Sequence, residues 1–245
     1  MLVKSPSFAV PDVIAKELTR FLEDQIIFGN LLPGERLVEE EIVRRHDVSR
    51  SPVRESFRML EQDGLVVRES RKGVRVSPID LRDLDEVYVC RLTLESLAAE
   101  VAATSRTNEQ IERMRAIIAN LRVAHESTDL PRYFRENVRL TDEISVACGN
   151  ATLKRLLKTI SKQALRYRWL AYSRAPDMLS LSLEANQEIV DAIARGRGKH
   201  ARMLTEDILQ QSWNRIRGFF PAPPKELVLE ELEDLPRIPQ QKQKR

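Results

Sequence analysis

The sequence predicts a mainly α-helical protein in which three helices and a β-hairpin come first and an all-α helical bundle follows. Three observations lead to this prediction. In residues 48–65, apolar residues and arginines both recur at helical spacing. Residues 66–77 form two short alternating runs around a basic turn, which is typical of a hairpin. From residue 81 to residue 220 strand signals are absent and apolar residues keep the helical period, so this chain of 245 residues is expected to form two domains.

The first helix is expected to begin at Pro11, which is tolerated in a first helical turn, and to end at Gly29. Its apolar face is carried by Ile14, Leu18, Phe21, Leu22 and Phe28. Residues 1–10 show no periodicity and are expected to be a flexible N-terminal arm.

The next two predicted helices are joined by a short turn at Asp47 and Val48, after a helical pattern in residues 37–46. Ser49 is a good N-cap for the later helix, and Gly64 favours its left-handed end. One face of this helix is apolar, with Val53, Phe57 and Leu60. A neighbouring face is basic, with Arg50, Arg54 and Arg58. Guanidinium groups suit phosphate oxygens and guanine edges, so this face favours DNA binding, the alternative being a solvated charged face.

The predicted hairpin has the basic residues Arg71 and Lys72 beside Gly73 at its tip. Helix, turn, helix and basic-tipped hairpin make a winged helix-turn-helix. Residues 44–75 contain nine Lys or Arg against five Asp or Glu, a local surplus of four positive charges that would meet a phosphate backbone.

Five or six long helices are expected in the second domain. They are predicted near residues 81–104, 108–121, 130–148, 151–170, 182–194 and 199–219. Thr107 and Gln110 have the spacing of a capping box, and Asn150 is placed to cap a helix after Gly149. A break is expected at residues 173–179, around Pro176. The apolar side of the first of these helices is expected to consist of Leu84, Val87, Leu94, Leu97, Ala98 and Val101.

Several motifs resemble those of GntR-type bacterial transcription regulators, in the branch called FadR-type. In the N-terminal part these motifs are PGERLVEEE (33–41), VSRSPVRESFRMLEQDGLV (48–66) and the wing pair Lys72 and Gly73. In the C-terminal part they are VYVCRLTLESLAAEVAA (87–103), CGNATL (148–153) and ANQEIVDAIARG (185–196). The resemblance implies a winged helix-turn-helix DNA-binding domain at 11–78 and an all-helical effector-binding and dimerisation domain at 79–220, followed by a flexible tail at 221–245.

The resemblance also implies a homodimer that binds an inverted repeat in double-stranded DNA. Its DNA contacts would be Ser49, Arg50, Ser51, Arg54, Lys72 and Gly73. Arg58 is expected to be a phosphate contact or a solvated charge. The acidic residues Glu39, Glu40 and Glu41 are explained by their place at the start of a helix, where carboxylates are favourable.

Effector binding is expected at Arg91, because a buried guanidinium needs an anionic partner and organic acids are the usual ligands of the family. The alternative is an ion pair within the helix with Glu95, four residues on. Arg166, Tyr167 and Arg168 are weaker candidates of the same kind.

Many members of the resembled branch hold a divalent metal with an Asp-x-x-x-His pair and two further histidines. In this sequence the pair falls on Asn137 and Thr141, and the histidines fall on Asn186 and near Asp207. These are poor ligands for a transition metal, so we expect no metal cofactor and a pocket in which Asn137, Thr141, Asn186 and Asp207 contact the effector. The alternative is a weak oxygen-ligated ion at Asp207 with Asp142 or Glu206.

A transcription regulator and not an enzyme is therefore expected, since phosphate loops, nucleophile elbows and His-Glu-x-x-His motifs are absent. The regulator is expected to be a repressor that a small organic acid releases from a palindromic operator. The alternative is a helical protein-interaction module whose winged helix no longer binds DNA. Cys90 and Cys148 are expected to be reduced thiols, and the absence of an export signal or membrane span favours the cytoplasm.

Overall fold

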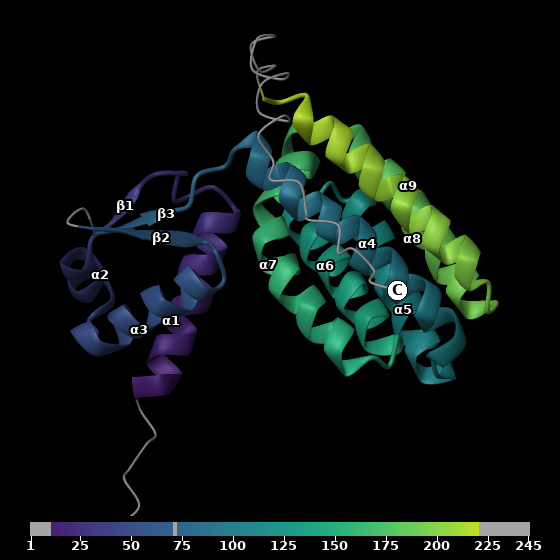
Figure 1. Cartoon of the computed structure of the whole chain (residues 1–245), viewed down its shortest axis with the longest axis horizontal. Helices are drawn as coiled ribbons and strands as arrows, with labels where there is room; N and C mark the ends of the chain where they lie inside the picture. The colour runs from purple at the N-terminus through teal and green to yellow at the C-terminus, as the bar shows by residue number, and fades with distance from the viewer. Residues whose placement is uncertain (1–10, 71–72, 221–245) are drawn as a thin grey trace, which may run out of the picture.

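The computed structural model describes residues 11–70 and 73–220 and has a small N-terminal unit beside a larger helical bundle (Figure 1). The N-terminal unit runs from α1 to β3. Its elements are α1 (Pro11–Ile27), β1 (Arg36–Leu37), α2 (Glu39–His46), α3 (Arg50–Gln62), β2 (Val66–Glu69) and β3 (Gly73–Val76). The predicted mainly α fold is confirmed.

Helix α3 has the predicted buried stripe, because Val53, Phe57 and Leu60 all lie in the core of the N-terminal unit. Ser49 occupies the N-cap position, although its side chain makes no capping hydrogen bond. Gly64 has a φ of 72°, the left-handed conformation expected where the chain leaves the helix. The same stripe that buries α3 leaves its arginine face outward.

The sheet of the N-terminal unit has one strand more than the sequence predicted. Its order is β1-β3-β2, and all neighbours are antiparallel. Leu37 of β1 pairs with Val74 of β3, so the segment before α2 ties the hairpin to the helices. A strand of two residues is too short to show an alternating pattern, so it could not be predicted from the sequence. The predicted tip residue Lys72 lies outside the described residues.

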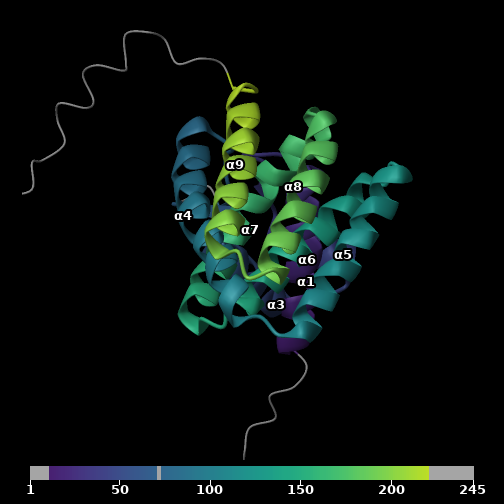
Figure 2. The same ribbon diagram turned by 90° about the vertical axis from the view of Figure 1, so that its right-hand side faces the viewer.

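The bundle consists of the helices that follow β3 (Figures 1 and 2). These are α4 (Leu81–Ser105), α5 (Asn108–Glu126), α6 (Leu130–Ala147), α7 (Ala151–Arg174), α8 (Asp177–Ala194) and α9 (Gly198–Arg217). Helix α4 packs against α9, α5 against α6, and α8 against α9. Two predicted caps are confirmed: Thr107 and Gln110 form a complete capping box, and Asn150 accepts hydrogen bonds from the backbone amides of Thr152 and Leu153.

Two expectations for the bundle were wrong. The break around Pro176 covers only two residues, and α8 begins at Asp177, well before the predicted start at Ser182. Proline disturbs the chain before it but is compatible with a helix start, so the new helix can begin at once. Leu97, expected in the core, is 36% exposed. The buried side of α4 is instead rich in alanine, which lets α9 approach closely.

Helix α7 connects the bundle to the N-terminal unit. The Nζ atom of Lys162 donates to Asp63 at 2.5 Å and to Glu23 at 3.3 Å. Arg166 donates from Nη1 and Nη2 to the carbonyl oxygens of Ser77 and Pro78, at 2.6 and 3.2 Å. We call these contacts the α7 junction. The predicted domain boundary at residues 78 and 79 falls beside it and stays a prediction.

Apolar contacts support the same junction. The ring of Phe28, just after α1, meets the rings of Trp169 and Phe134 at centroid distances of 4.7 and 5.7 Å. Ile27 is buried in the core of the bundle and not in that of the N-terminal unit. Across the described ranges, no helix combines the length and apolar character that crossing a membrane requires.

Candidate functional site

The arginine face of α3 is exposed and each arginine is paired with a carboxylate. Arg50 Nη2 lies 3.5 Å from Glu40 Oε1, and Arg54 Nε lies 2.9 Å from Glu39 Oε2. Glu39 and Glu40 do stand in the first turn of α2, as expected for acidic residues at a helix start. They also orient the arginines of the next helix, a role that the sequence analysis missed. The Glu39 hydrogen bond raises the pKa of Arg54.

A groove of about 530 Å³ lies between this face, the start of α2 and the sheet. Arg36, Arg50, Arg54 and Arg68 line it together with Gly73. Ser49 and Ser51 are exposed at the start of α3. Of the predicted DNA contacts, Arg50, Arg54 and Gly73 line the groove, beside Arg36 and Arg68, which were not predicted, whereas Ser49 and Ser51 do not line it. Their contact with DNA stays a prediction. Arg36 was missed because its place on β1 was not predicted.

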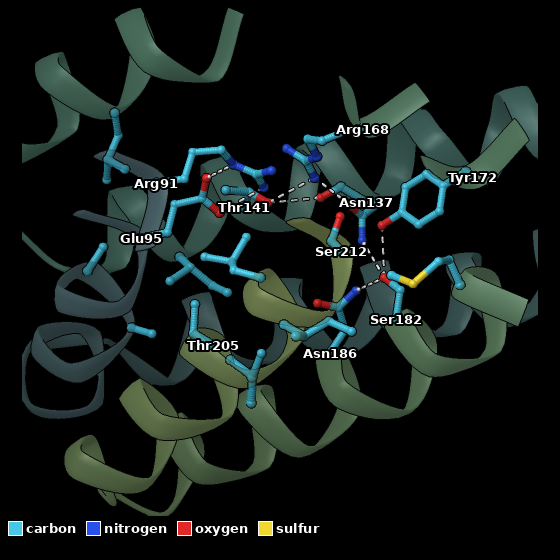
Figure 3. A pocket seen from close by; sticks show the side chains of 18 residues that line it. Arg91, Glu95, Asn137, Thr141, Arg168, Tyr172, Ser182, Asn186, Thr205 and Ser212 are labelled. Atoms are coloured by element: carbon cyan, nitrogen blue, oxygen red, sulfur yellow. Dashed lines mark hydrogen bonds and ion pairs between the residues drawn. The ribbon is translucent and has the colours of Figure 1, made fainter. Parts of the chain in front are cut away.

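The bundle encloses a cavity of about 70 Å³ between α4, α6, α7, α8 and α9 (Figure 3). We call it the bundle cavity. One wall is apolar and consists of Ala98, Ala99, Ile144, Leu157, Met178, Ile189, Ile208 and Leu209. The rest is polar and consists of Arg91, Glu95, Asn137, Thr141, Arg168, Tyr172, Ser182, Asn186, Thr205 and Ser212. Each of the five helices contributes polar groups, so the cavity depends on the packing of the whole bundle.

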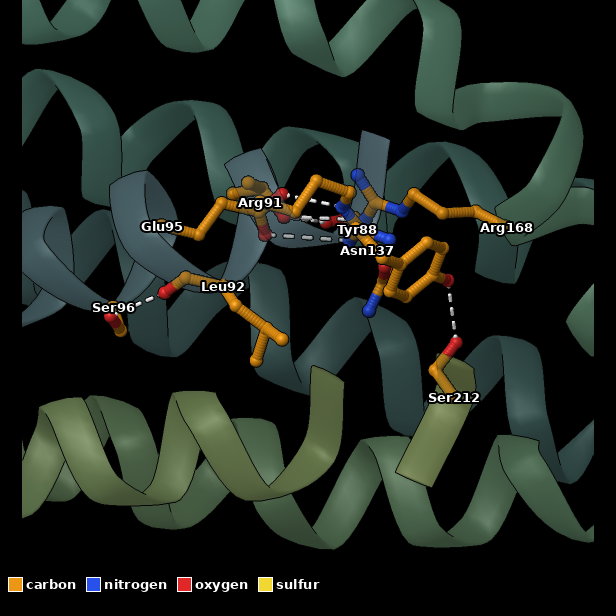
Figure 4. A network of polar contacts seen from close by, with 9 residues as sticks. Tyr88, Arg91, Leu92, Glu95, Ser96, Asn137, Arg168 and Ser212 are labelled. Atoms are coloured by element: carbon orange, nitrogen blue, oxygen red, sulfur yellow. Dashed lines mark hydrogen bonds and ion pairs between the residues drawn. The ribbon is translucent and has the colours of Figure 1, made fainter. Parts of the chain in front are cut away.

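Arg91 and Glu95 form a buried ion pair at the edge of the bundle cavity (Figure 4). Arg91 Nε lies 2.7 Å from Glu95 Oε1, and the two side chains are 4% and 9% exposed. Burial alone would lower the pKa of Arg91, but the charge and hydrogen bond of Glu95, together with Tyr88 and Tyr172, outweigh it and the pKa is raised. The Nη1 atom of Arg91 is buried without a hydrogen-bond partner. The ion pair within the helix, which was the alternative interpretation of the sequence, is therefore present, and effector binding by Arg91 stays a prediction.

Arg168 enters the bundle cavity from α7 and donates to two groups of α6. Its Nη2 atom bonds to Oδ1 of Asn137 and, at 3.2 Å, to Oγ1 of Thr141. Burial lowers the pKa of Arg168, and the neighbouring charge of Arg91 lowers it further. Asn137 and Thr141 thus both hold Arg168, and their direct contact with an effector stays a prediction.

A second set of hydrogen bonds centres on Ser182. Its Oγ atom accepts from Nδ2 of Asn137 and from Nδ2 of Asn186, both at 3.2 Å, and lies 2.9 Å from the hydroxyl of Tyr172. Ser182 and Tyr172 were not predicted from the sequence as residues of the cavity. Tyr172 follows Arg168 by four residues, so the helical period could have placed both on one face of α7.

One predicted effector contact lies elsewhere. Asp207 is exposed on α9 and does not line the bundle cavity, whereas Thr205 and Leu209 of the same helix do. Residues 205 and 209 are one turn apart and share a face, which leaves residue 207 pointing away. Glu206, the other candidate ion ligand on α9, accepts a hydrogen bond of 2.8 Å from Arg202.

The weaker candidates Arg166 and Tyr167 also lie outside the bundle cavity. Arg166 belongs to the α7 junction, and the Tyr167 hydroxyl donates to Asp83. Of the three adjacent residues singled out on α7, only Arg168 reaches the cavity.

The polar groups of the bundle cavity do not fit a divalent metal. The side chains at the positions of the Asp-x-x-x-His pair, Asn137 and Thr141, are neutral and bonded to the guanidinium of Arg168. A cation next to two guanidinium groups would be repelled, with Glu95 as the single carboxylate of the lining. In the described part of the chain, no three His, Cys, Asp or Glu side chains gather closely enough to hold a metal ion.

Comparison with known proteins assigns both parts of the chain. Residues 14–76 match the model of the bacterial regulatory proteins of the gntR family, and residues 86–211 match the model of the FCD domain. The chain is 31% identical over 141 residues to the HTH-type transcriptional regulator YdhC of Bacillus subtilis (strain 168), covering 57% of this chain and 63% of that relative. It is 25% identical over 206 residues to the HTH-type transcriptional repressor RspR of Escherichia coli (strain K12), covering 80% and 90%.

Solved structures show the same arrangement. A GntR transcriptional regulator from Rhodococcus sp. RHA1 aligns with a TM-score of 0.69 at 25% identity, over 84% of this chain and 99% of that one. McbR/YncC of E. coli aligns with a TM-score of 0.75 at 18% identity, over 85% and 99%, and so supports the fold alone. The chain therefore belongs to the GntR family of bacterial transcription regulators, with an FCD domain in its C-terminal part.

Proposed function

We propose that this regulator is a cytoplasmic, homodimeric repressor which binds a palindromic operator and leaves it when a small carboxylic acid enters the bundle cavity. The observation that carries the proposal is the charge of the cavity. Two buried guanidinium groups, Arg91 and Arg168, face one carboxylate, Glu95. Burying an unmatched charge is costly, and an entering anion would remove that cost.

The free donor of Arg91 supports an anionic ligand. A buried guanidinium nitrogen without a partner costs free energy that a ligand oxygen would recover. Guanidinium groups bind carboxylates especially well because their parallel N–H groups match the two oxygens.

The volume and the apolar wall limit the ligand further. The cavity of about 70 Å³ has room for a few water molecules, each of which needs about 10 to 15 Å³ of such space. A short unbranched monocarboxylate, with its tail against Ala98 and Ile189, suits this shape. A longer acid would need one wall of the cavity to move.

The DNA contacts follow from the exposed face of α3. Ser49, Arg50, Ser51 and Arg54 lie where a recognition helix presents side chains to a major groove, with Gly73 at the edge of the wing. Two such helices, related by a two-fold axis, would require DNA with two-fold symmetry. We assign no enzymatic activity to the chain.

Operator binding and ligand response can be tested together on the full-length protein. Binding to the DNA upstream of its own gene is measured by fluorescence anisotropy, with sodium acetate, propionate or butyrate added, and with the matching amides as uncharged controls. We expect the acids to weaken binding and the amides to have no effect. If none of the acids changes DNA binding or melting temperature at concentrations at which the matching amides are inert, the carboxylate effector is contradicted.

DNA binding by α3 can be tested separately with one substitution. Arg50→Ala should abolish sequence-specific binding, because it removes one of the guanidinium groups that reach the base edges. Folded Arg50→Ala protein with unchanged operator preference would instead favour a module that no longer reads DNA through α3.

A further inference from the structure

The cation best placed to hold the effector is Arg168, which sequence reasoning ranked below Arg91. Resting on the proposed function, we infer that Arg168 is a built-in anchor for the effector carboxylate, doing with a side chain what a bound metal ion would do at this place. Its Nη2 atom lies between Asn137 and Thr141, one helical turn apart on α6. These are the two positions onto which the Asp-x-x-x-His pair of the resembled branch falls.

Among the described residues Arg168 forms no ion pair, although the carboxylates of Glu95 and Asp142 lie near enough to interact with its charge. Its partners on α6 are an amide oxygen and a hydroxyl oxygen, both neutral. The carboxylate of the cavity, Glu95, is engaged by Arg91 at 2.7 Å. With 5% of its surface exposed, Arg168 has also lost most of its contact with water. A guanidinium that is desolvated and forms no ion pair is poor for stability, which points to a role in binding.

The groups around Arg168 fix its position. Asn137 uses its oxygen for Arg168 and its nitrogen for Ser182, so the amide cannot turn over without losing one of these bonds. Ser182 in turn joins Tyr172 and Asn186. The guanidinium is thus held in place before a ligand arrives, which reduces the entropy lost on binding.

The charge argument gives an isosteric test. Asn137→Asp places a carboxylate against Arg168 without changing the shape of the side chain. The variant should be more stable than the wild type when no ligand is present, because the missing anion is supplied. It should also lose its response to carboxylates, because Arg168 is then neutralised. If the amide were only a structural partner, the same change would bury an additional charge and lower the melting temperature.

Removal of the cation gives the complementary test. Arg168→Met should lose at least about tenfold in affinity for acetate, propionate and butyrate, since a charged hydrogen bond is lost. Its melting temperature without ligand should not fall, because the unmatched buried charge is removed while Arg91 and Glu95 remain as a neutral pair. Arg168→Lys keeps the charge and should restore part of the response. Arg155→Met is the matched control, because Arg155 lies on the exposed side of α7 and its guanidinium donates to the hydroxyl of Thr152, outside the bundle cavity.

The measurements are thermal shifts and calorimetric titrations of full-length protein, each repeated with EDTA and with zinc chloride alone. We expect the wild-type response to carboxylates to survive EDTA, and zinc alone to give no stoichiometric binding. Carboxylate binding that Arg168→Met retains in full would overturn the inference, as would binding that EDTA abolishes. Absence of any carboxylate response in wild type, with Asn137→Asp still more stable, would refute the proposed ligand class and leave the unmatched charge of Arg168 supported.

Discussion

At the scale of single residues, the decisive feature of the bundle cavity is its ratio of charges. Arg91 and Arg168 are both buried, and Glu95 balances one of them. The pKa directions agree with this imbalance, since that of Arg91 is raised by Glu95 whereas that of Arg168 is lowered by burial and by Arg91. Glu95 therefore determines both the stability of the protein without ligand and the affinity of the bundle cavity for anions. A substitution of Glu95 should change these two properties in opposite directions.

Glu95→Gln separates the two properties. The substitution leaves both guanidinium groups without a carboxylate, and breaking a buried pair in this way costs about 3 kcal/mol. We expect a lower melting temperature without ligand and a larger stabilisation by sodium acetate than in wild type. Glu143→Gln, which breaks the more exposed pair with Arg113, is the control and should change neither property appreciably. A smaller acetate effect in Glu95→Gln would contradict the charge argument.

At the scale of elements, the close contact between α4 and α9 depends on a residue without a side chain. A Cβ atom added to Gly198, the first residue of α9, would lie 2.7 Å from the carbonyl oxygen of Glu100 in α4. Backbone cannot give way as a flexible side chain can. These two helices carry Arg91, Glu95 and Thr205, so their spacing also determines the width of the bundle cavity.

Gly198→Ala tests this spacing, because the direction in which it changes the melting temperature depends on whether α9 can move away from α4. Alanine is the better helix former by about 1 kcal/mol, so helix propensity alone would raise the melting temperature. Overpacking against a backbone atom costs about 1 to 3 kcal/mol, and we expect this cost to prevail. Thermal unfolding of the full-length variant decides the matter, and a raised melting temperature would show that α9 can move away from α4 freely.

The elements that the sequence predicted well are those fixed by local chemistry. The Thr107 capping box, the Asn150 cap and the left-handed Gly149 each depend on neighbours in the chain, and each is present. Strand β1 depends on pairing with the distant strand β3, and the proline at residue 176 is compatible either with a longer break or with the immediate helix start that the structure shows. No pattern in the sequence decides either point, so these two features could not be predicted.

The residues of the bundle cavity can also be separated into those that could be predicted from the sequence and those that could not. Arg91, Asn137, Thr141 and Asn186 were predicted to line it, and they do. Asp207 was misplaced because an alignment error of two residues moves a helical side chain by about 200° around the axis. The role of Arg168 could not be derived from one sequence, because its partners lie on α6, which is distant in the chain.

At the scale of the whole molecule, the α7 junction determines how the DNA-binding unit is held. Lys162 stands between Glu23 and Asp63, and the three side chains are 27%, 16% and 25% exposed. Burial would lower the pKa of Lys162, but its bonds to the two carboxylates outweigh this effect and raise the pKa. The pKa of Glu23 is raised by burial, despite the attraction of Lys162.

The pH dependence of this contact follows from the sign of the Lys162 shift. A lysine whose folded pKa is raised stabilises the protein fully below its ordinary pKa of 10.5 and ceases to do so as pH rises through the folded value. Lys162→Met should therefore be less stable than wild type by about 1 kcal/mol at neutral pH, since the pair is only partly buried. The difference should shrink above pH 10.5.

Urea unfolding at a series of pH values measures this difference. Lys158→Met, which removes an exposed lysine from the same helix, is the control and should follow wild type throughout. A Lys162→Met protein that differs from wild type equally at neutral and alkaline pH would show that the junction does not depend on the charge of Lys162.

Helix α7 also makes the size of a ligand matter, independently of its charge. Arg166 and Arg168 leave the helix about 200° apart, one toward the carbonyls of Ser77 and Pro78 and the other into the cavity. A helix moves as a rigid unit. An acid that is too long for the cavity and displaces α7 would therefore also displace Ser77 and Pro78, to which Arg166 is bonded. In a series of acids of increasing chain length, each added methylene group would then displace the DNA-reading helix α3 further from its position in the ligand-free protein.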